Sequence, residues 1–198
     1  TAGKLVFQVT ADGRFVAYAA DTGNKLWESP AQTGIVAAPI TYTIGGEQYI
    51  TVMAGWGGAY ALIMGDAAAA NNVRHVGRIL TFKLGTTGQL PPLAAVKPIP
   101  KPIPVIASPE VVQKGESLYL HNCVKCHGAG VVSGGVLPDL RHSDPAMFGI
   151  YQDIVLRGAL EAKGMPRLGD RLSAEDVEAI KTFVLSKAWD DYEKRNKP

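Results

Sequence analysis

The chain has 198 residues, a formal net charge of +2 and an apolar fraction of 46%. This length allows one or two domains, and the composition is that of a globular protein. Acidic and basic residues are mixed along the chain, which argues against nucleic-acid binding through a basic surface. No uninterrupted apolar stretch approaches the roughly 18 to 20 residues that span a bilayer. The first residues lack the pattern of a secretory signal, so we expect any export signal to have been removed or to lie upstream.

The first part of the chain carries short apolar runs separated by turn signals. We expect strands in five runs, at residues 4–9, 15–19, 35–43, 48–53 and 79–84. Ala11-Asp12-Gly13 is a candidate hairpin turn between the first two runs, and Gly45-Gly46 separates the third from the fourth. The pattern predicts antiparallel β-structure.

A proline-rich stretch divides the chain. Its prolines are Pro91, Pro92, Pro98, Pro100, Pro102, Pro104 and Pro109. Proline fixes φ and lacks a backbone donor, so closely spaced prolines favour an extended, semi-rigid spacer. We therefore predict a linker over residues 89–108, between a β-domain over 1–88 and a helical domain over 109–198. An irregular loop that packs on the surface of one domain is the alternative.

Beyond the linker the apolar periodicity becomes helical, around residues 111–121 and 174–192. Between these segments lies Cys123-Val124-Lys125-Cys126-His127, a CxxCH site. In such a site two thiols add to the vinyl groups of heme, and the adjacent imidazole becomes the proximal iron ligand. The chain has only these two cysteines, so no second pair completes a zinc site. We therefore predict heme c attached at Cys123 and Cys126 and ligated by His127.

The second axial ligand is expected on a loop downstream of the attachment site. Met165, in the segment Gly164-Met165-Pro166, offers a soft thioether. Thioether ligation favours ferrous iron and raises the reduction potential, which suits an electron carrier. The alternatives that remain open are Met147, His142, His121 and His75.

Residues 109–198 resemble the small class I c-type cytochromes over nearly all of their length. Gly115 and Tyr119, at i and i+4, would let the first helix approach the last, where Phe183 is the expected partner. The resemblance also implies that the carbonyl of Pro138 accepts the N–H of the proximal imidazole, which fixes its orientation. Arg141 is implied to meet a heme propionate, with a solvated surface charge as the alternative.

Residues 4–27 resemble a blade of the propeller found in pyrroloquinoline quinone (PQQ) dehydrogenases. Ala17, Gly23 and Trp27 match the tryptophan-docking motif of that family, whereas Ala19 stands where an Asp is usual. The resemblance implies that the indole of Trp27 wedges between neighbouring blades.

The segment Ala54-Gly55-Trp56-Gly57 resembles the closing region of that propeller, which the family places beside PQQ. Glycine lets backbone approach a flat cofactor closely. Trp56 and Gly57 are therefore candidate PQQ contacts, and an ordinary tight turn with a packed Trp is the alternative.

The order of these pieces resembles that of the quinohemoprotein alcohol dehydrogenases. The implied fold is an antiparallel β-segment, part of an eight-bladed propeller, followed by an all-α class I cytochrome c domain. About one and a half blades are expected here, and they need the rest of the propeller to cover their edges. The catalytic base and the calcium ligands of the family match no position of this chain.

The implied function is heme electron transfer within a periplasmic enzyme that oxidises alcohols to aldehydes with PQQ and Ca²⁺. The implied partners are the remaining propeller portion and a downstream acceptor, either a small redox protein or a quinone. A free-standing c-type cytochrome with a β docking module is the alternative from a different class. A heme sensor or peroxidase with an open distal site is a third hypothesis.

Overall fold

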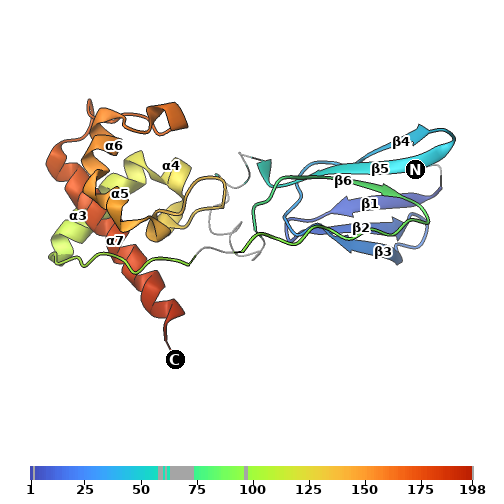
Figure 1. Ribbon diagram of the computed structural model, residues 1–198, viewed down its shortest axis with the longest axis horizontal. Helices are drawn as coiled ribbons and strands as arrows, with labels where there is room; N and C mark the ends of the chain where they lie inside the picture. Colours follow the sequence, from blue (N-terminus) through green and yellow to red (C-terminus); the bar gives the residue numbers. More distant parts are fainter. Residues whose placement is uncertain (2, 58–59, 61, 63–73, 96–97, 198) are drawn as a thin grey trace. The chain divides into compact units, whose positions relative to one another are not determined.

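The computed structural model describes residues 1–198 except 2, 58–59, 61, 63–73, 96–97 and 198. The chain divides into two compact units, Thr1–Val96 and Lys97–Pro198. The first unit is built of strands and the second of helices (Figure 1), and element labels follow that figure. Within the part of the chain that is described, no helix is both long and apolar enough to cross a membrane.

The first unit contains two three-stranded antiparallel sheets. The first sheet has the order β1 (Leu5–Val9), β2 (Arg14–Ala19), β3 (Lys25–Pro30), and the second has the order β4 (Ile40–Ile44), β5 (Glu47–Ala54), β6 (Arg78–Lys83). Successive residues of a strand point to opposite faces, so each sheet turns one apolar set inward. One cluster of buried apolar residues in this unit consists of Phe15, Ala31, Ile35, Val52, Ala54 and Leu80. The prediction of antiparallel β-structure is confirmed.

Two strands differ from the predicted runs. The sequence predicts no strand over residues 25–30, where β3 lies. Most side chains of this strand are exposed, so its sequence lacks the alternation of apolar and polar residues by which a half-buried strand is identified. The sequence also predicts one strand over residues 35–43, whereas β4 begins at Ile40. Pro39 has no N–H to donate to a ladder, so the strand starts after it. Ile35 instead forms an isolated bridge with Gly55.

Trp27 links the two sheets of the first unit. It pairs with Ala17 in the β2–β3 register, and Gly23 turns the chain between the two strands with a φ of 74°. Its ring meets Phe15 of β2 at 5.7 Å and Phe82 of β6 at 5.1 Å, edge-on in both cases. The indole therefore lies between two sheets, where the tryptophan-docking motif predicts it.

The second unit is helical. Its elements are α3 (Pro109–Asn122), α4 (Val124–His127), η1 (Ala129–Val131), η2 (Leu140–His142), α5 (Pro145–Gly149), α6 (Tyr151–Arg157), η3 (Glu161–Lys163) and α7 (Ala174–Arg195). A capping box starts α7, because the Ser173 side chain accepts the Asp176 backbone N–H and the Asp176 carboxylate accepts that of Ser173. The predicted helices are confirmed.

The first and last helices of this unit pack closely. A Cβ at Gly115 of α3 would lie 2.0 Å from the carbonyl oxygen of Ala179 in α7. Four residues later, the ring of Tyr119 meets that of Phe183, with 5.4 Å between the ring centroids. These contacts confirm the prediction that α3 and α7 approach each other closely at Gly115, which has no side chain.

The proline-rich segment forms no helix or strand in its described part between β6 and α3. Leu90 packs against the core of the first unit, whereas Ile103 and Val105 pack against the helical core. The indole Nε1 of Trp189 donates a hydrogen bond of 2.9 Å to the carbonyl of Ile103. Part of the segment therefore docks on each unit, and the linker and domain boundaries at 89–108 stay a prediction.

We expect Gly115→Ala to destabilise the helical unit, although alanine has the higher helix propensity. The added methyl group forces α3 and α7 apart against a backbone carbonyl, and such overpacking costs about 1–3 kcal/mol. Urea denaturation followed by the helical circular dichroism signal measures the loss. Gly149→Ala in α5 is the matched control, because a Cβ there meets no atom within 4 Å. Equal stability of the two variants would contradict the prediction.

Candidate functional site

The CxxCH segment begins where α3 ends. Cys123 follows the last residue of α3, and its N–H donates to the carbonyl of Tyr119 at 2.8 Å. The N–H groups of Cys126 and His127 both donate to the Cys123 carbonyl, at 3.2 and 3.0 Å, which forms the single turn of α4. Residues three and four apart lie on the same face of a helix. The two sulfurs and the imidazole therefore originate on one side of α4.

Neither cysteine forms a disulfide. Cys123 is half-buried and Cys126 is exposed, and both are free. Burial raises the pKa of the Cys123 thiol to about 11, and the charge of a Cys126 thiolate adds to the shift. Reactive redox cysteines have lowered pKa values, so Cys123 does not fit a redox motif. The described residues also contain no group of three or more His, Cys, Asp or Glu side chains that could hold a metal ion.

His127 is half-buried, and its Nδ1 atom is shielded from solvent. Within the described part of the chain, that atom forms no hydrogen bond. Burial lowers the pKa of His127, while the backbone carbonyl of Pro138 and the charge of Asp139 act in the opposite direction. The Pro138 carbonyl thus affects the pKa of this ring, although the two groups do not form a hydrogen bond here. When one nitrogen of a neutral imidazole lies near a hydrogen-bond acceptor, the other nitrogen is available to bind a metal.

These observations fit a covalently attached heme. Both thiols are free, and burial raises the pKa of the Cys123 thiol and lowers the pKa of the His127 imidazole. The assignment of Cys123, Cys126 and His127 as heme-binding residues stays a prediction.

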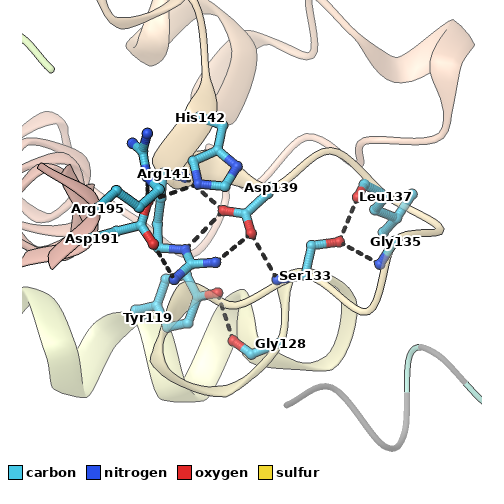
Figure 2. Close-up of polar contacts among 10 residues, drawn as sticks. All are labelled: Tyr119, Gly128, Ser133, Gly135, Leu137, Asp139, Arg141, His142, Asp191 and Arg195. Carbon is cyan, nitrogen blue, oxygen red and sulfur yellow. Dashed lines mark hydrogen bonds and ion pairs between the residues drawn. The ribbon is translucent and has the colours of Figure 1, made fainter. Parts of the chain in front are cut away.

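Gly128 is a residue of this site that the sequence alone did not single out. It has a φ of 80°, and a Cβ there would lie 1.9 Å from the carbonyl oxygen of Val132. The hydroxyl of Tyr119 donates a buried hydrogen bond of 2.8 Å to the Gly128 carbonyl (Figure 2). A glycine directly after the histidine of CxxCH is the sequence signal that could have indicated this turn.

Two methionines lie at the helical core. Met165 follows η3, its N–H donates to the carbonyl of Leu160 at 3.2 Å, and its half-buried side chain packs against the core. Gly164, with a φ of 91°, turns the chain directly before it. Met147 of α5 is half-buried against the same core. The assignment of Met165 as the distal ligand stays a prediction.

The three histidine alternatives have other surroundings. His142 Nε2 lies 2.9 Å from a carboxylate oxygen of Asp191, so this ring is already paired. The exposed His121 has its Nδ1 2.7 Å from the carbonyl of Ser117, within its own helix. His75 belongs to the first unit, where its ring lies 6.2 Å from that of Trp56.

Arg141 lies in a network of charged side chains (Figure 2). Its guanidinium binds both carboxylate oxygens of Asp139, at 2.9 and 2.7 Å, and lies 3.4 Å from Asp191 of α7. The Arg141 side chain is only 16% exposed, which argues against the solvated surface charge. Contact with a heme propionate stays a prediction. The two carboxylates were not predicted from the sequence.

The two candidate PQQ contacts lie in the first unit. Trp56 is 2% exposed, and its Nε1 donates to the Ala11 carbonyl at 3.3 Å. A Cβ at Gly34 would lie 1.4 Å from that nitrogen, so the indole fills the space that a side chain there would occupy. Gly57 is exposed and has a φ of 55°. This packing of the indole matches the alternative to PQQ binding, which is an ordinary tight turn with a packed Trp. PQQ contact by Trp56 and Gly57 stays a prediction.

Two family models match the chain. The model described as "Cytochrome C oxidase, cbb3-type, subunit III" matches residues 110–184. The model described as "Glucose/ethanol/alcohol dehydrogenase, beta-propeller domain" matches residues 1–50. The first match contains the CxxCH segment, and the second contains the tryptophan-docking motif.

Relatives match over the whole chain. The chain is 48% identical over 201 residues to quinohemoprotein alcohol dehydrogenase ADH IIB of Pseudomonas putida, covering 100% of this chain and 29% of that protein. It is 42% identical over 189 residues to the quinohemoprotein alcohol dehydrogenase of Comamonas testosteroni, covering 95% of this chain and 26% of that protein. The solved structure of ADHIIG from Pseudomonas putida matches with a TM-score of 0.91 at 43% identity, covering 98% of this chain and 28% of that one. The chain is homologous throughout to the C-terminal portion of the quinohemoprotein alcohol dehydrogenases.

The quinohemoprotein alcohol dehydrogenase match confirms the predicted order of a propeller end followed by a cytochrome c domain. The two family-model matches also support heme c and PQQ as cofactors. The chain spans less than a third of the length of these relatives, 29% of ADH IIB.

Asp191 is expected to stabilise the helical unit in a pH-dependent way. Burial acts to raise the pKa of Asp191, but hydrogen bonds from His142 and Arg195 and the charges of Arg141 and His142 outweigh it, so the pKa lies below its usual value of 3.8. A carboxylate with a depressed pKa stabilises the fold above its unfolded pKa and loses that effect as the pH falls through the folded value.

The measurement is the free energy of unfolding of the wild type and of Asp191→Asn between neutral pH and pH about 3. At neutral pH we expect Asp191→Asn to be less stable by about 1–3 kcal/mol, since charge-assisted hydrogen bonds are lost. The difference should shrink below the unfolded pKa of 3.8. Asp190→Asn, which removes an exposed carboxylate 3.5 Å from Lys187, is the control. A difference that is independent of pH would count against this role of the carboxylate charge.

Proposed function

We propose that this chain transfers single electrons through heme c within a PQQ-dependent alcohol dehydrogenase that oxidises alcohols to aldehydes. The observation that supports this most is the CxxCH segment, in which His127 keeps a buried Nδ1 beside the Pro138 carbonyl. The segment lies in a chain that is homologous throughout to quinohemoprotein alcohol dehydrogenases. A ligand imidazole needs this arrangement, with an acceptor at one nitrogen and the metal at the other.

The residues of the second unit have distinct roles in this proposal. Cys123 and Cys126 hold the heme through thioethers, His127 is the proximal ligand, and Met165 is the distal ligand. When bound, the heme iron supplies one-electron redox chemistry. Apolar side chains that pack on the helical core would limit the access of water: Leu140, Leu160 and Leu168. With His127 and Met165 both bound to it, the iron would have no position left for a small molecule, which would favour electron transfer over ligand activation.

Two further residues orient these ligands. The carbonyl of Pro138 accepts the N–H of the proximal imidazole and holds the ring in one orientation. Arg141 would bind a heme propionate, with its guanidinium held in place by Asp139 and Asp191.

Alcohol oxidation itself belongs to the complete enzyme. Conversion of an alcohol to an aldehyde removes two electrons, whereas heme iron accepts one at a time, so the relay acts twice per alcohol. PQQ and Ca²⁺ would be held mainly by the remaining propeller portion, with Trp56 and Gly57 as contacts from this chain. This division is supported by the share of the relatives that the chain spans, 29% of ADH IIB.

The proposed location is the periplasm. Quinohemoprotein alcohol dehydrogenases are extracytoplasmic enzymes. A CxxCH site fits this location, because heme c is attached outside the bacterial cytoplasm. From the heme, electrons would pass to a small redox protein or to a quinone.

The full-length enzyme with PQQ and Ca²⁺ is expected to reduce its heme when 1-butanol is added. This alcohol is a suitable probe because a relative at 39% identity is named 1-butanol dehydrogenase (cytochrome c), from Thauera butanivorans. The isolated chain of 198 residues, given the same additions, should turn over no alcohol and keep its heme oxidised until dithionite is added. Rapid-mixing absorption spectroscopy of the heme measures both reactions.

The control for that experiment is the full-length Cys123→Ser/Cys126→Ser variant, which should carry no covalent heme by mass spectrometry. Covalent heme in this variant would show that the attachment site lies elsewhere. Alcohol turnover by the isolated chain would contradict the assignment of catalysis to the rest of the enzyme.

The distal ligand is tested by two conservative variants, Met165→Leu and Met147→Leu. Both methionines are half-buried at the helical core, so the substitutions are matched in size and surroundings. We expect Met165→Leu alone to lose the weak sulfur-to-iron band near about 700 nm, to lower the reduction potential and to let the reduced iron bind carbon monoxide. Loss of the band in Met147→Leu instead would transfer the ligand role to Met147. Ready carbon monoxide binding by the wild type would favour an open distal site.

A further inference from the structure

The loop that follows the proximal histidine is held at both ends by long helices (Figure 2). At its start, Tyr119 of α3 donates from its hydroxyl to the Gly128 carbonyl at 2.8 Å. At its end, Arg141 and His142 of η2 both contact Asp191 of α7. The loop between these anchors carries Pro138, so its position depends on them.

Asp191 is the centre of the second anchor. One of its carboxylate oxygens lies 2.9 Å from His142 Nε2 and accepts a hydrogen bond of 2.8 Å from Arg195 Nε, while the other lies 3.4 Å from Arg141. Its side chain is 19% exposed, so these contacts are partly shielded from water and salt. A carboxylate with three cationic or polar partners from two elements holds η2 on α7.

The anchor reaches Pro138 through Arg141 and Asp139. The guanidinium of Arg141 binds both oxygens of the Asp139 carboxylate, at 2.9 and 2.7 Å. The same carboxylate accepts the backbone N–H groups of Ser133, at 3.3 Å, and Arg141, at 3.0 Å. A bidentate pair of this kind has a fixed geometry. Asp139 is therefore immobilised, and Pro138 is the residue bonded directly to it.

We propose that Asp191 is a positioning residue for the proximal ligand: through Arg141 and Asp139 it keeps the Pro138 carbonyl beside the buried Nδ1 of His127. This inference rests on the proposed role of His127 as the proximal ligand. Asp191 lies 64 positions after that histidine and acts on it only through the residues between.

The contact between the Pro138 carbonyl and the His127 ring affects the reduction potential of the iron. An acceptor on the ring N–H makes the imidazole a more basic ligand, which stabilises ferric iron relative to ferrous iron. A displaced Pro138 carbonyl therefore favours the reduced state. It also leaves the ring N–H less protected from exchange with solvent.

The test uses the full-length, heme-loaded enzyme with Asp191→Asn. We expect the equilibrium ratio of ferrous to ferric iron to rise about threefold, which is about 28 mV at about 59 mV per tenfold change. We also expect faster exchange of the His127 ring N–H, measured by NMR in the reduced protein. Spectroelectrochemistry measures the potential.

Asp190→Asn is the matched control, because it removes the same charge from the adjacent residue of α7. The carboxylate of Asp190 lies 3.5 Å from Lys187 and is not part of the network drawn in Figure 2. A general effect of charge would change the potential of both variants alike. An effect through Pro138 would change the potential and the ring N–H exchange in Asp191→Asn only.

Asp191→Glu is the second variant, since it retains the charge but displaces it by one methylene group. Its potential and exchange rate should lie between those of the wild type and Asp191→Asn. If Asp191→Asn does not fold, faster exchange in Asp191→Glu than in the wild type still supports the proposal. Wild-type potential and exchange in the folded Asp191 variants would overturn it. Absence of covalent heme from the wild type would instead refute the proposed function.

Discussion

The close contact between α3 and α7 at Gly115 positions the rest of the helical unit. Any side chain there would meet the Ala179 carbonyl at about 2.0 Å, so the helices approach only because residue 115 has none. The C-terminal end of α3 leads directly into Cys123, and the C-terminal part of α7 carries Asp191. Tightly packed interiors transmit displacements of this kind. The helix contact therefore fixes both ends of the segment that contains the candidate heme ligands.

Burial then determines the charge state of that segment. Removal from water disfavours the charged form of a group, so one cause raises the pKa of Cys123 and lowers the pKa of His127. Both side chains are left uncharged. An uncharged thiol and a neutral imidazole can lie against an apolar macrocycle without the cost of burying an ion. The carboxylate of Asp191, in contrast, is partly buried together with its partners, because Arg141, His142 and Arg195 all contact it.

The sequence predicts features that depend on neighbouring residues. The CxxCH turn and the first and last helices were found because their patterns are local, and the contact at Gly115 followed from their spacing. The strand β3 was missed because its side chains are mostly exposed. Asp191 was missed because its partner Arg141 is 50 positions away, and a lone Asp on a helix has no pattern that indicates such pairing. The family resemblance supplied Pro138 and Arg141, which composition and spacing do not indicate.

The first unit carries an exposed apolar face that a complete propeller would cover. On the second sheet, Met53 pairs with Ile79 and Ile40 pairs with Thr51, and the three apolar side chains are 65%, 72% and 62% exposed. The alternate residues of the same strands point inward and are buried: Val52, Ala54 and Leu80. Contiguous apolar surface of this kind marks an interface more often than a free surface. In a complete propeller, a face of this kind would lie against a neighbouring blade. The helical unit has its own buried core and a candidate ligand set of its own, so it does not depend on that face for its chemistry.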